Sequence, residues 1–251
     1  MRCRAARTQA RRRRSKVNEV PSLTRRATAE GLGAFALVFA GCGAIVTNAE
    51  RAGTLGTVGV SLVFGLVILA AIAAVGHISG AHFNPAVTTS FFLTRHLPGR
   101  DAGTYIAAQF AGATAGALLL WLVWPAKPAD LGATVPSIAV GRAVIVEGLM
   151  SALLMLVILS VATDTRAAGA PAAIAIGATI ALDALFGGPL TGASMNPARS
   201  FGPALVSGQW KDFWVYLAGP LIGAPLGAFA YQFVRGEHPR LPSPAPEAED
   251  R

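Results

Sequence analysis

The sequence predicts an all-α membrane protein in which six transmembrane helices and two shorter re-entrant half-helices form an inverted repeat. Three observations support this fold class. Only 14% of the 251 residues are charged and 53% are hydrophobic, whereas about 25% of an average soluble domain is charged. Long stretches of the chain contain no Lys, Arg, Asp or Glu. An octapeptide pattern occurs once in each half of the chain.

The uncharged stretches are long enough to cross a membrane. A helix needs about 20 apolar residues to span a bilayer, and the uncharged stretches cover residues 31–49, 52–94, 102–126 and 213–234. Segments inside lipid must satisfy their own backbone hydrogen bonds, so we expect helices. A β-barrel is disfavoured because apolar and polar residues do not alternate. The expected spans are residues 28–47, 57–76, 102–124, 138–162, 170–187 and 212–235.

Two further apolar segments, residues 84–93 and 196–206, are too short to cross a bilayer. Each begins with the tripeptide Asn-Pro-Ala. Asn is a favoured N-cap and Pro is favoured at the first helical position, so each tripeptide is expected to begin a helix. We therefore expect two re-entrant half-helices.

The two halves of the chain repeat each other. Residues 79–86 (SGAHFNPA) match residues 191–198 (TGASMNPA) at an offset of 112, and Glu30-Gly31-Leu32 recurs as Glu147-Gly148-Leu149. Each half holds three spans and one half-helix. Because three is odd, the second half enters the membrane from the opposite side, which makes the repeat inverted. A functional site is expected near the midplane, between the halves.

The expected domain organisation has three parts. Residues 1–27 form a basic arm, since ten of the 21 Lys and Arg residues lie within positions 1–26. Residues 28–235 form the membrane-embedded domain, with repeat 1 at about 28–124 and repeat 2 at about 138–235. Residues 236–251 form a polar tail, and both ends are expected to be disordered. A targeting peptide, a nucleic-acid or lipid-binding tail and a start codon placed too far upstream are alternatives for the arm.

Charge also predicts the topology. Cytoplasmic loops carry an excess of Lys and Arg, and the basic arm places the N-terminus on the cytoplasmic side. Six spans then return the C-terminus to the same side. We expect a multi-pass protein of the cell membrane whose arm contacts anionic lipid and which has no nucleic-acid partner.

The half-helices are expected to meet at their N-terminal ends. If they enter from opposite faces, both positive dipole ends point at the centre of the membrane. The side-chain amides of Asn84 and Asn196 would then be able to donate hydrogen bonds to a molecule between them. Two Asn-Pro-Ala copies in matching places of a repeat are therefore more than ordinary helix caps.

Residues 76–88 and 192–204 resemble the two signature loops of the aquaporin (major intrinsic protein) family. The resemblance extends over about residues 28–235. It implies an hourglass of six tilted helices and two half-helices, one pore per subunit, a homotetramer and no cofactor. The motifs that carry the resemblance are Asn84, Pro85, Ala86, Asn196, Pro197 and Ala198.

The resemblance also implies roles for individual residues. Asn84 and Asn196 orient water in single file, while Arg199 and the dipole ends repel hydronium and cations. Glu30 and Glu147 accept hydrogen bonds from the re-entrant loops.

The family's narrowest filter maps onto Phe64, Ala184, Ala193 and Arg199, and His77 maps onto the cytoplasmic half of the pore. Strict water channels usually have His at the position of Ala184. Its replacement by Ala widens the constriction and allows glycerol, ammonia, hydrogen peroxide or neutral metalloid hydroxides.

Other positions favour water as a permeant. Small residues and then an aromatic pair, as in water channels of the family, occur at Ser200, Ala204, Phe213 and Trp214. We therefore expect a channel for water and other small neutral solutes. The alternative is a facilitator whose main solute is glycerol or a metalloid hydroxide.

Asp183 has no assigned role, since a buried carboxylate in a span is unfavourable. It could line the vestibule, pair with Arg199 or face a subunit interface. His82 is expected to pack a loop, and a metal site with His77 is not expected.

The sequence disfavours two other classes of function. Inverted repeats also build secondary transporters, but apart from Arg199 and Asp183 the expected pore residues are neutral, which favours a passive channel. No catalytic triad, metal cluster or phosphate-binding loop supports an enzyme.

Overall fold

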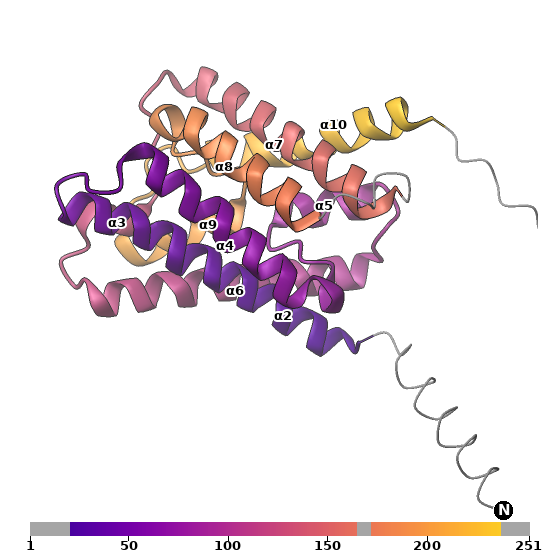
Figure 1. Cartoon of the computed structure of the whole chain (residues 1–251), viewed down its shortest axis with the longest axis horizontal. Coiled ribbons are helices and arrows are strands. Elements are labelled where there is room, and N and C mark those ends of the chain that lie inside the picture. The colour runs from indigo at the N-terminus through magenta and orange to yellow at the C-terminus, as the bar shows by residue number, and fades with distance from the viewer. Residues whose placement is uncertain (1–20, 165–171, 237–251) are drawn as a thin grey trace, which may run out of the picture.

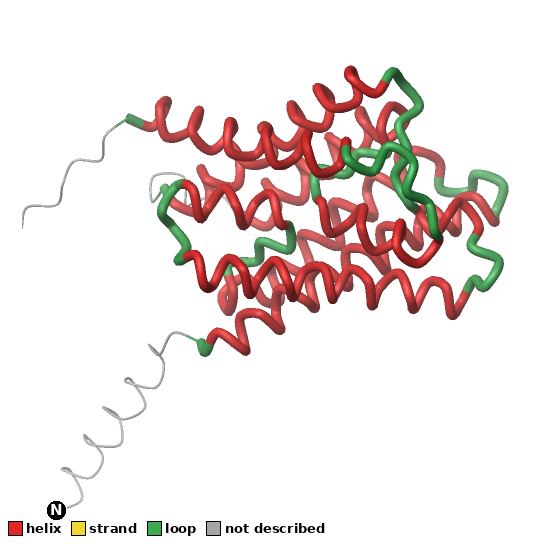
Figure 2. The backbone as a smooth tube through the Cα atoms, turned by 180° about the vertical axis from the view of Figure 1, so that it is seen from behind, coloured by secondary structure: helices red, strands yellow, loops and turns green. Residues whose placement is uncertain are grey.

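The structure is a computed structural model that describes residues 21–164 and 172–236, and every regular element among them is a helix. Long helices pack side by side along the longest axis (Figures 1 and 2). Six helical segments are long and apolar enough to span a membrane. The predicted all-α membrane fold is therefore confirmed.

The first span is built from three consecutive helical pieces: α2 (Leu23–Ala36), the π-helical segment η1 (Leu37–Cys42) and α3 (Gly43–Glu50). The other five spans are α4 (Gly56–Ser79), α6 (Gly99–Val123), α7 (Val140–Thr163), α8 (Ala172–Thr191) and α10 (Val215–Arg235).

The helix ends differ from the predicted spans by up to five residues, and the largest difference is at the start. The first helix begins at Leu23 rather than at residue 28. Ser22 caps it by accepting a hydrogen bond from the backbone N–H of Arg25 at 3.4 Å. Arg26 pairs with Asp101 at 2.8 Å. Residues 23–27 thus belong to a helix, while residues 1–20 of the expected arm and most of the tail (237–251) lie outside the described residues.

Two short helices, α5 (Pro85–Leu93) and α9 (Pro197–Ser207), lie between the long ones (Figure 1). Their bounds agree with the segments that were too short to span. A connection containing the turn η2 (Pro128–Gly132) links the two repeats.

Glycines let the long helices approach each other at equivalent places in the two repeats. A Cβ atom added at Gly112 on α6 would collide with the backbone of Gly31 on α2. The same addition at Gly223 on α10 would collide with the backbone of Gly148 on α7. Small residues permit such close backbone contact inside membranes. The pairs α2–α6 and α7–α10 therefore form matching halves of the scaffold.

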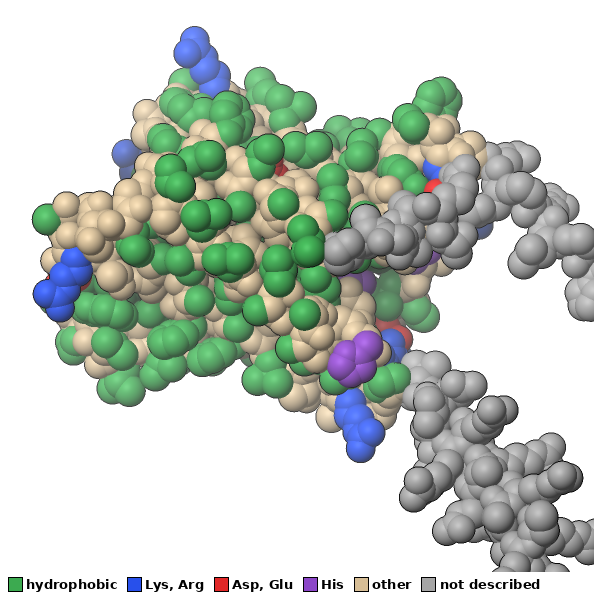
Figure 3. Space-filling view, viewed as in Figure 1, with side chains coloured by type: hydrophobic (Ala, Val, Ile, Leu, Met, Phe, Trp, Pro, Cys, Tyr) green, Lys and Arg blue, Asp and Glu red, His purple; other side chains and the backbone are tan. Residues whose placement is uncertain are grey.

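The outer surface of the bundle is apolar. Large hydrophobic side chains lie exposed along the helices, among them Leu122, Leu149 and Leu226, exposed to 73%, 66% and 61%. Figure 3 shows such side chains over the middle of one face, with Lys and Arg near the ends of the bundle. This distribution suits a protein surrounded by lipid.

Candidate functional site

The site begins where the two half-helices meet. Asn84 and Asn196 have extended backbones, and each side chain accepts a hydrogen bond from the first turn of its own helix. The Oδ1 of Asn84 accepts from the backbone N–H of Ala86 at 2.8 Å. The Oδ1 of Asn196 accepts from the backbone N–H of Ala198 at 3.0 Å. Both residues therefore act as N-caps, with Pro as the next residue.

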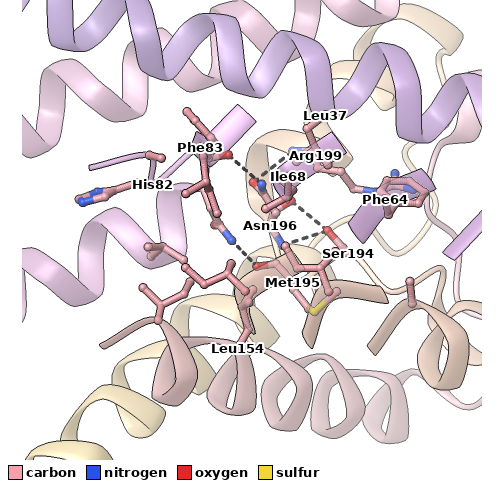
Figure 4. Close-up of a pocket in the computed structure, with 18 of the residues that line it drawn as sticks. Leu37, Phe64, Ile68, His82, Phe83, Leu154, Ser194, Met195, Asn196 and Arg199 are labelled. Atoms are coloured by element: carbon pink, nitrogen blue, oxygen red, sulfur yellow. Dashed lines mark hydrogen bonds between the residues drawn. The ribbon is translucent and has the colours of Figure 1, made fainter. Parts of the chain in front are cut away.

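The two caps also hold each other's loops. The Nδ2 of Asn84 donates to the carbonyl oxygen of Met195 at 2.8 Å. The Nδ2 of Asn196 donates to the carbonyl oxygen of Phe83 at 2.9 Å (Figure 4). An amide carries two N–H donors, so one donor of each Asn is used in this clasp and one is left. Both Asn residues line the central cavity.

Buried Glu30 supports the first loop. Its Oε1 accepts from the Ser79 hydroxyl at 2.7 Å and from the backbone N–H of His82 at 3.0 Å. Its Oε2 accepts from the backbone N–H of Phe83 at 2.6 Å and from Nε2 of Gln109 at 2.8 Å. Four donors thus satisfy a carboxylate that is 0% exposed.

Buried Glu147 supports the second loop in the same way. Its Oε1 accepts from the Thr191 hydroxyl at 2.7 Å and from the backbone N–H of Ser194 at 2.9 Å. Its Oε2 accepts from the backbone N–H of Met195 at 2.7 Å. Each repeat therefore uses one glutamate to hold two consecutive backbone N–H groups.

The loops need this support because their backbones are strained. Ala81 and Phe83 have φ values of 54° and 50°, and the equivalent Ala193 and Met195 have 43° and 53°. Side chains other than glycine seldom adopt such angles, which cost about 1–3 kcal/mol each. The strained residues orient the carbonyls that accept from the Asn caps.

Three neighbouring cavities share lining residues at this point. A vestibule of about 540 Å³ and another of about 430 Å³ are joined by a constriction of about 40 Å³. The constriction shares Phe64, Ala184 and Ala193 with the first vestibule, and Ile72, His82 and Ile158 with the second. Because one water needs about 10–15 Å³ of such space, the constriction holds only a few waters.

Four residues predicted for the filter lie together at one end of the constriction. Arg199 is only 2% exposed, and its Nη1 donates to the carbonyl oxygen of Gly132 at 2.8 Å. Its guanidinium carbon lies 5.0 Å from the centre of the Phe64 ring (Figure 4). Nε and Nη2 of Arg199 have no protein partner among the described residues, and Ala184 and Ala193 complete the wall. This part of the passage therefore combines unused donors with two methyl groups.

The predicted histidines occupy different positions. His77 is exposed and lines the vestibule at the end of α4. The ring of His82 borders the constriction but points away from its centre (Figure 4) and stacks on Phe91, with 4.4 Å between centroids. Its Nδ1 lies 3.1 Å from the Thr88 hydroxyl. No group of three potential metal ligands occurs in the described parts of the chain.

Asp183 is 1% exposed and borders none of the three cavities of the passage. Its Oδ2 has no hydrogen-bond partner within the described residues. The structure therefore places it behind the filter wall, next to Ala184, and not on the surface of the passage.

Sequence reasoning missed several supporting groups. Gly132 was not predicted because it contributes only a carbonyl oxygen, which every residue has. The hydroxyls of Tyr105 and Tyr216 donate to the carbonyls of Ser79 and Thr191 at 2.9 and 2.6 Å. The recurrence of this Tyr in both repeats was a usable signal for that pair.

The fold and this site define a membrane channel: a narrow passage between two inverted half-helices in a bundle of six spans. A model of the family described as "Major intrinsic protein" matches residues 17–231. The chain therefore belongs to the major intrinsic protein family, which is a family of channels, and is a multi-pass membrane channel for water and small neutral solutes.

Individual proteins show the same relationship. The chain is 46% identical to putative aquaporin NIP4-1 of Arabidopsis thaliana over 213 residues, 85% of this chain and 75% of that protein. It is 44% identical to nodulin-26 of Glycine max over 207 residues, 82% of this chain and 76% of that protein. Among solved structures, the aquaglyceroporin from Plasmodium falciparum matches with a TM-score of 0.78 at 26% identity, covering 84% of this chain and 96% of that one.

Proposed function

We propose that water and small neutral solutes larger than water, including glycerol and neutral metalloid hydroxides, pass through a filter formed by Phe64, Ala184, Ala193 and Arg199. The observation that carries the proposal is the pairing of two methyl groups with the free donors of Arg199. A hydroxylated solute can accept hydrogen bonds from the arginine while its carbon side contacts Phe64 and the alanines. The structural likeness to an aquaglyceroporin supports a solute of this kind.

The central clasp supports exclusion of ions in this proposal. Each Asn cap retains one N–H donor for the oxygen of a passing solute, and both helix dipoles present their positive ends there. Arg199 adds a full positive charge at one end of the constriction. Cations and hydronium are repelled, while neutral solutes are hydrogen-bonded in passage.

The filter assignment is tested by comparing the original chain with Ala184→His in proteoliposomes, using stopped-flow light scattering with water and glycerol gradients. The histidine narrows the filter, so glycerol flux should fall at least tenfold while water flux stays within a few-fold. Ala178→His is the matched control, because Ala178 is exposed on the same helix and lines none of these cavities. Unchanged glycerol flux in Ala184→His would contradict the assignment of Ala184 to the filter.

We further propose that transport is passive and that the protein is not an enzyme. Among the described residues that line the constriction, Arg199 is the one Arg, Lys, Asp or Glu, so these residues offer no pair of charged groups to couple solute to an ion. Flux should therefore rise linearly with the solute gradient and ignore ion gradients. Saturating flux that follows a proton or sodium gradient would indicate a coupled transporter.

The assembly and orientation proposed here are a homotetramer in the cell membrane with both termini cytoplasmic. Exposed apolar side chains on α4 and α8, such as Leu66 and Phe186 (59% and 61% exposed), support burial against neighbouring copies. Native mass spectrometry would report the number of subunits. Labelling of single cysteines introduced beside Arg51 and Arg100 would report which face is cytoplasmic.

A further inference from the structure

The outside of the bundle carries two grooves that occupy equivalent places in the inverted repeat. One groove, of about 670 Å³, lies between α2 and α6. The other, of about 470 Å³, lies between α7 and α10. Glycines that bring the paired helices together line both grooves, namely Gly31 with Gly112 and Gly148 with Gly223.

The two grooves differ at one end. Every residue that lines the α7–α10 groove is apolar or glycine. The α2–α6 groove has an apolar part lined by residues such as Leu32, Phe35 and Ala111. Its other end carries Arg100 and three threonines, Thr24, Thr28 and Thr104. The α6 and α10 sequences are related by an offset of 111, as Tyr105 and Tyr216 show, so the start of α10 at Val215 is equivalent to Thr104. The difference arises because α6 starts five residues earlier, at Gly99, and this added turn carries Arg100.

The charge at this end is available. Arg26 is paired with Asp101, but no interaction of the Arg100 guanidinium occurs with any described residue, and Arg100 is exposed. Thr24 is also exposed, and no described group bonds its hydroxyl. Both α2 and α6 begin at this end, so their positive dipole ends add to the attraction for an anion.

The groove as a whole is about as long as one leaflet of a bilayer. The α2 side of the groove runs from Leu23 to Phe35, which is about 18 Å at 1.5 Å per residue. Half of the hydrocarbon core of a bilayer is about 15 Å. The groove is therefore amphiphilic: a cationic end and an apolar remainder together extend over about one leaflet.

We propose that the α2–α6 groove binds an anionic phospholipid, with its phosphate at Arg100 and Thr24 and one acyl chain along the apolar part. A second copy of this chain fits less well. The acidic residues described at this end are already engaged: Asp101 pairs with Arg26, and Asp164 accepts from the Tyr231 hydroxyl at 2.8 Å. Neither is available to meet Arg100.

The test is native mass spectrometry of the purified full-length protein, stripped of lipid and then mixed with phosphatidylglycerol or phosphatidylcholine of identical chains. Phosphatidylglycerol should bind about fivefold more tightly, the equivalent of about 1 kcal/mol for one basic residue at a membrane surface. Arg100→Gln should abolish this preference. Lys211→Gln, the corresponding position in the second repeat, should keep it. Equal binding of both lipids by the original chain, or an unchanged preference in Arg100→Gln, would overturn the proposal.

A second pair of variants tests the acyl chain. Ala111→Phe fills the α2–α6 groove and should lower binding of phosphatidylglycerol several-fold, while Ile222→Phe, at the matching place in the α7–α10 groove, should not. Glycerol phosphate, which has the headgroup alone, should not compete at millimolar concentration; if it does, the site takes free anions and the lipid proposal fails. If Ala111→Phe breaks the oligomer instead of releasing lipid, the groove is a subunit interface and the proposal fails.

Discussion

Replacing Glu30 or Glu147 by glutamine should destabilise the re-entrant loop that each one supports, by a similar amount. Only the replacement in the second loop should change solute selectivity. Glu147→Gln and Glu30→Gln keep the side-chain shape and replace one carboxylate oxygen by an NH₂ group. Each carboxylate accepts from two consecutive backbone N–H groups, one on each oxygen. In either orientation of the amide, one of these N–H groups must therefore face a donor.

The magnitude follows from that count. A buried donor left without a partner costs about 1–3 kcal/mol, so each variant should lose about that much free energy of unfolding. The strained residues of the loop then relax. In the second loop these include Ala193, which lines the filter, and Met195, whose carbonyl holds Asn84. The first loop contributes no residue of the predicted filter.

The assays are thermal unfolding in detergent and stopped-flow measurement of water and glycerol permeability in liposomes. Both variants should unfold at lower temperature by similar amounts. The ratio of glycerol to water permeability should change in Glu147→Gln and stay constant in Glu30→Gln. Equal changes of the ratio in both variants, or no loss of stability in either, would refute the assigned roles of these glutamates.

Three other predictions follow from the same structure. Gly223→Ala places a methyl group against the backbone of Gly148 and should lower the free energy of unfolding by about 1–3 kcal/mol. Gly103→Ala, which has open space around it, should not lower it. Equal melting temperatures of the two variants would contradict this packing. Asp183→Asn should raise or preserve the melting temperature, since the buried Oδ2 has no described partner and an unpaired buried charge is unfavourable; a clear drop would reveal an essential role for the carboxylate. Arg199→Val should allow protons to leak, which a pH-sensitive dye inside liposomes would measure. If this variant remains impermeable to protons, Arg199 is not needed to exclude them and the Asn caps suffice.

The element types could be predicted from the sequence because the membrane leaves few choices. Uncharged segments of spanning length must be helices. Each Asn-Pro pair, at residues 84–85 and 196–197, predicts the start of a helix. The first boundary could not be predicted from the apolar pattern. Arg26 lies within the helix because Asp101, 75 residues away, neutralises it, and the apolar pattern does not indicate such a pairing.

The parts of the site that escaped prediction are made of backbone. The carbonyls of Phe83, Met195 and Gly132 act as acceptors for Asn196, Asn84 and Arg199. Every residue type has a backbone carbonyl, so the sequence does not indicate which carbonyls act as acceptors. Gly132 is placed by a turn in which Ala129, Asp130 and Leu131 all have φ near 50°. Asp adopts this region more readily than most residues, but Ala and Leu seldom do, so the three residue types together do not predict the turn.

The inverted repeat explains the scaffold, and the departures from it explain the function. The clasp, the paired glutamates and the strained loops are nearly identical in the two halves, so they produce a passage that is symmetric by itself. At an offset of 112, however, Arg199 corresponds to Val87, and both line the same constriction. One end of the constriction therefore holds the unpartnered donors of Arg199, to which the proposed function assigns contact with a solute, and the equivalent position at the other end is the apolar Val87. The Arg100 turn is a second departure of this kind, on the outside of the molecule. Exchanging Val87 and Arg199 should therefore move the selective step to the opposite end of the constriction, away from Phe64, Ala184 and Ala193. In this double variant, replacing Ala184 by His should no longer change the glycerol and water permeabilities.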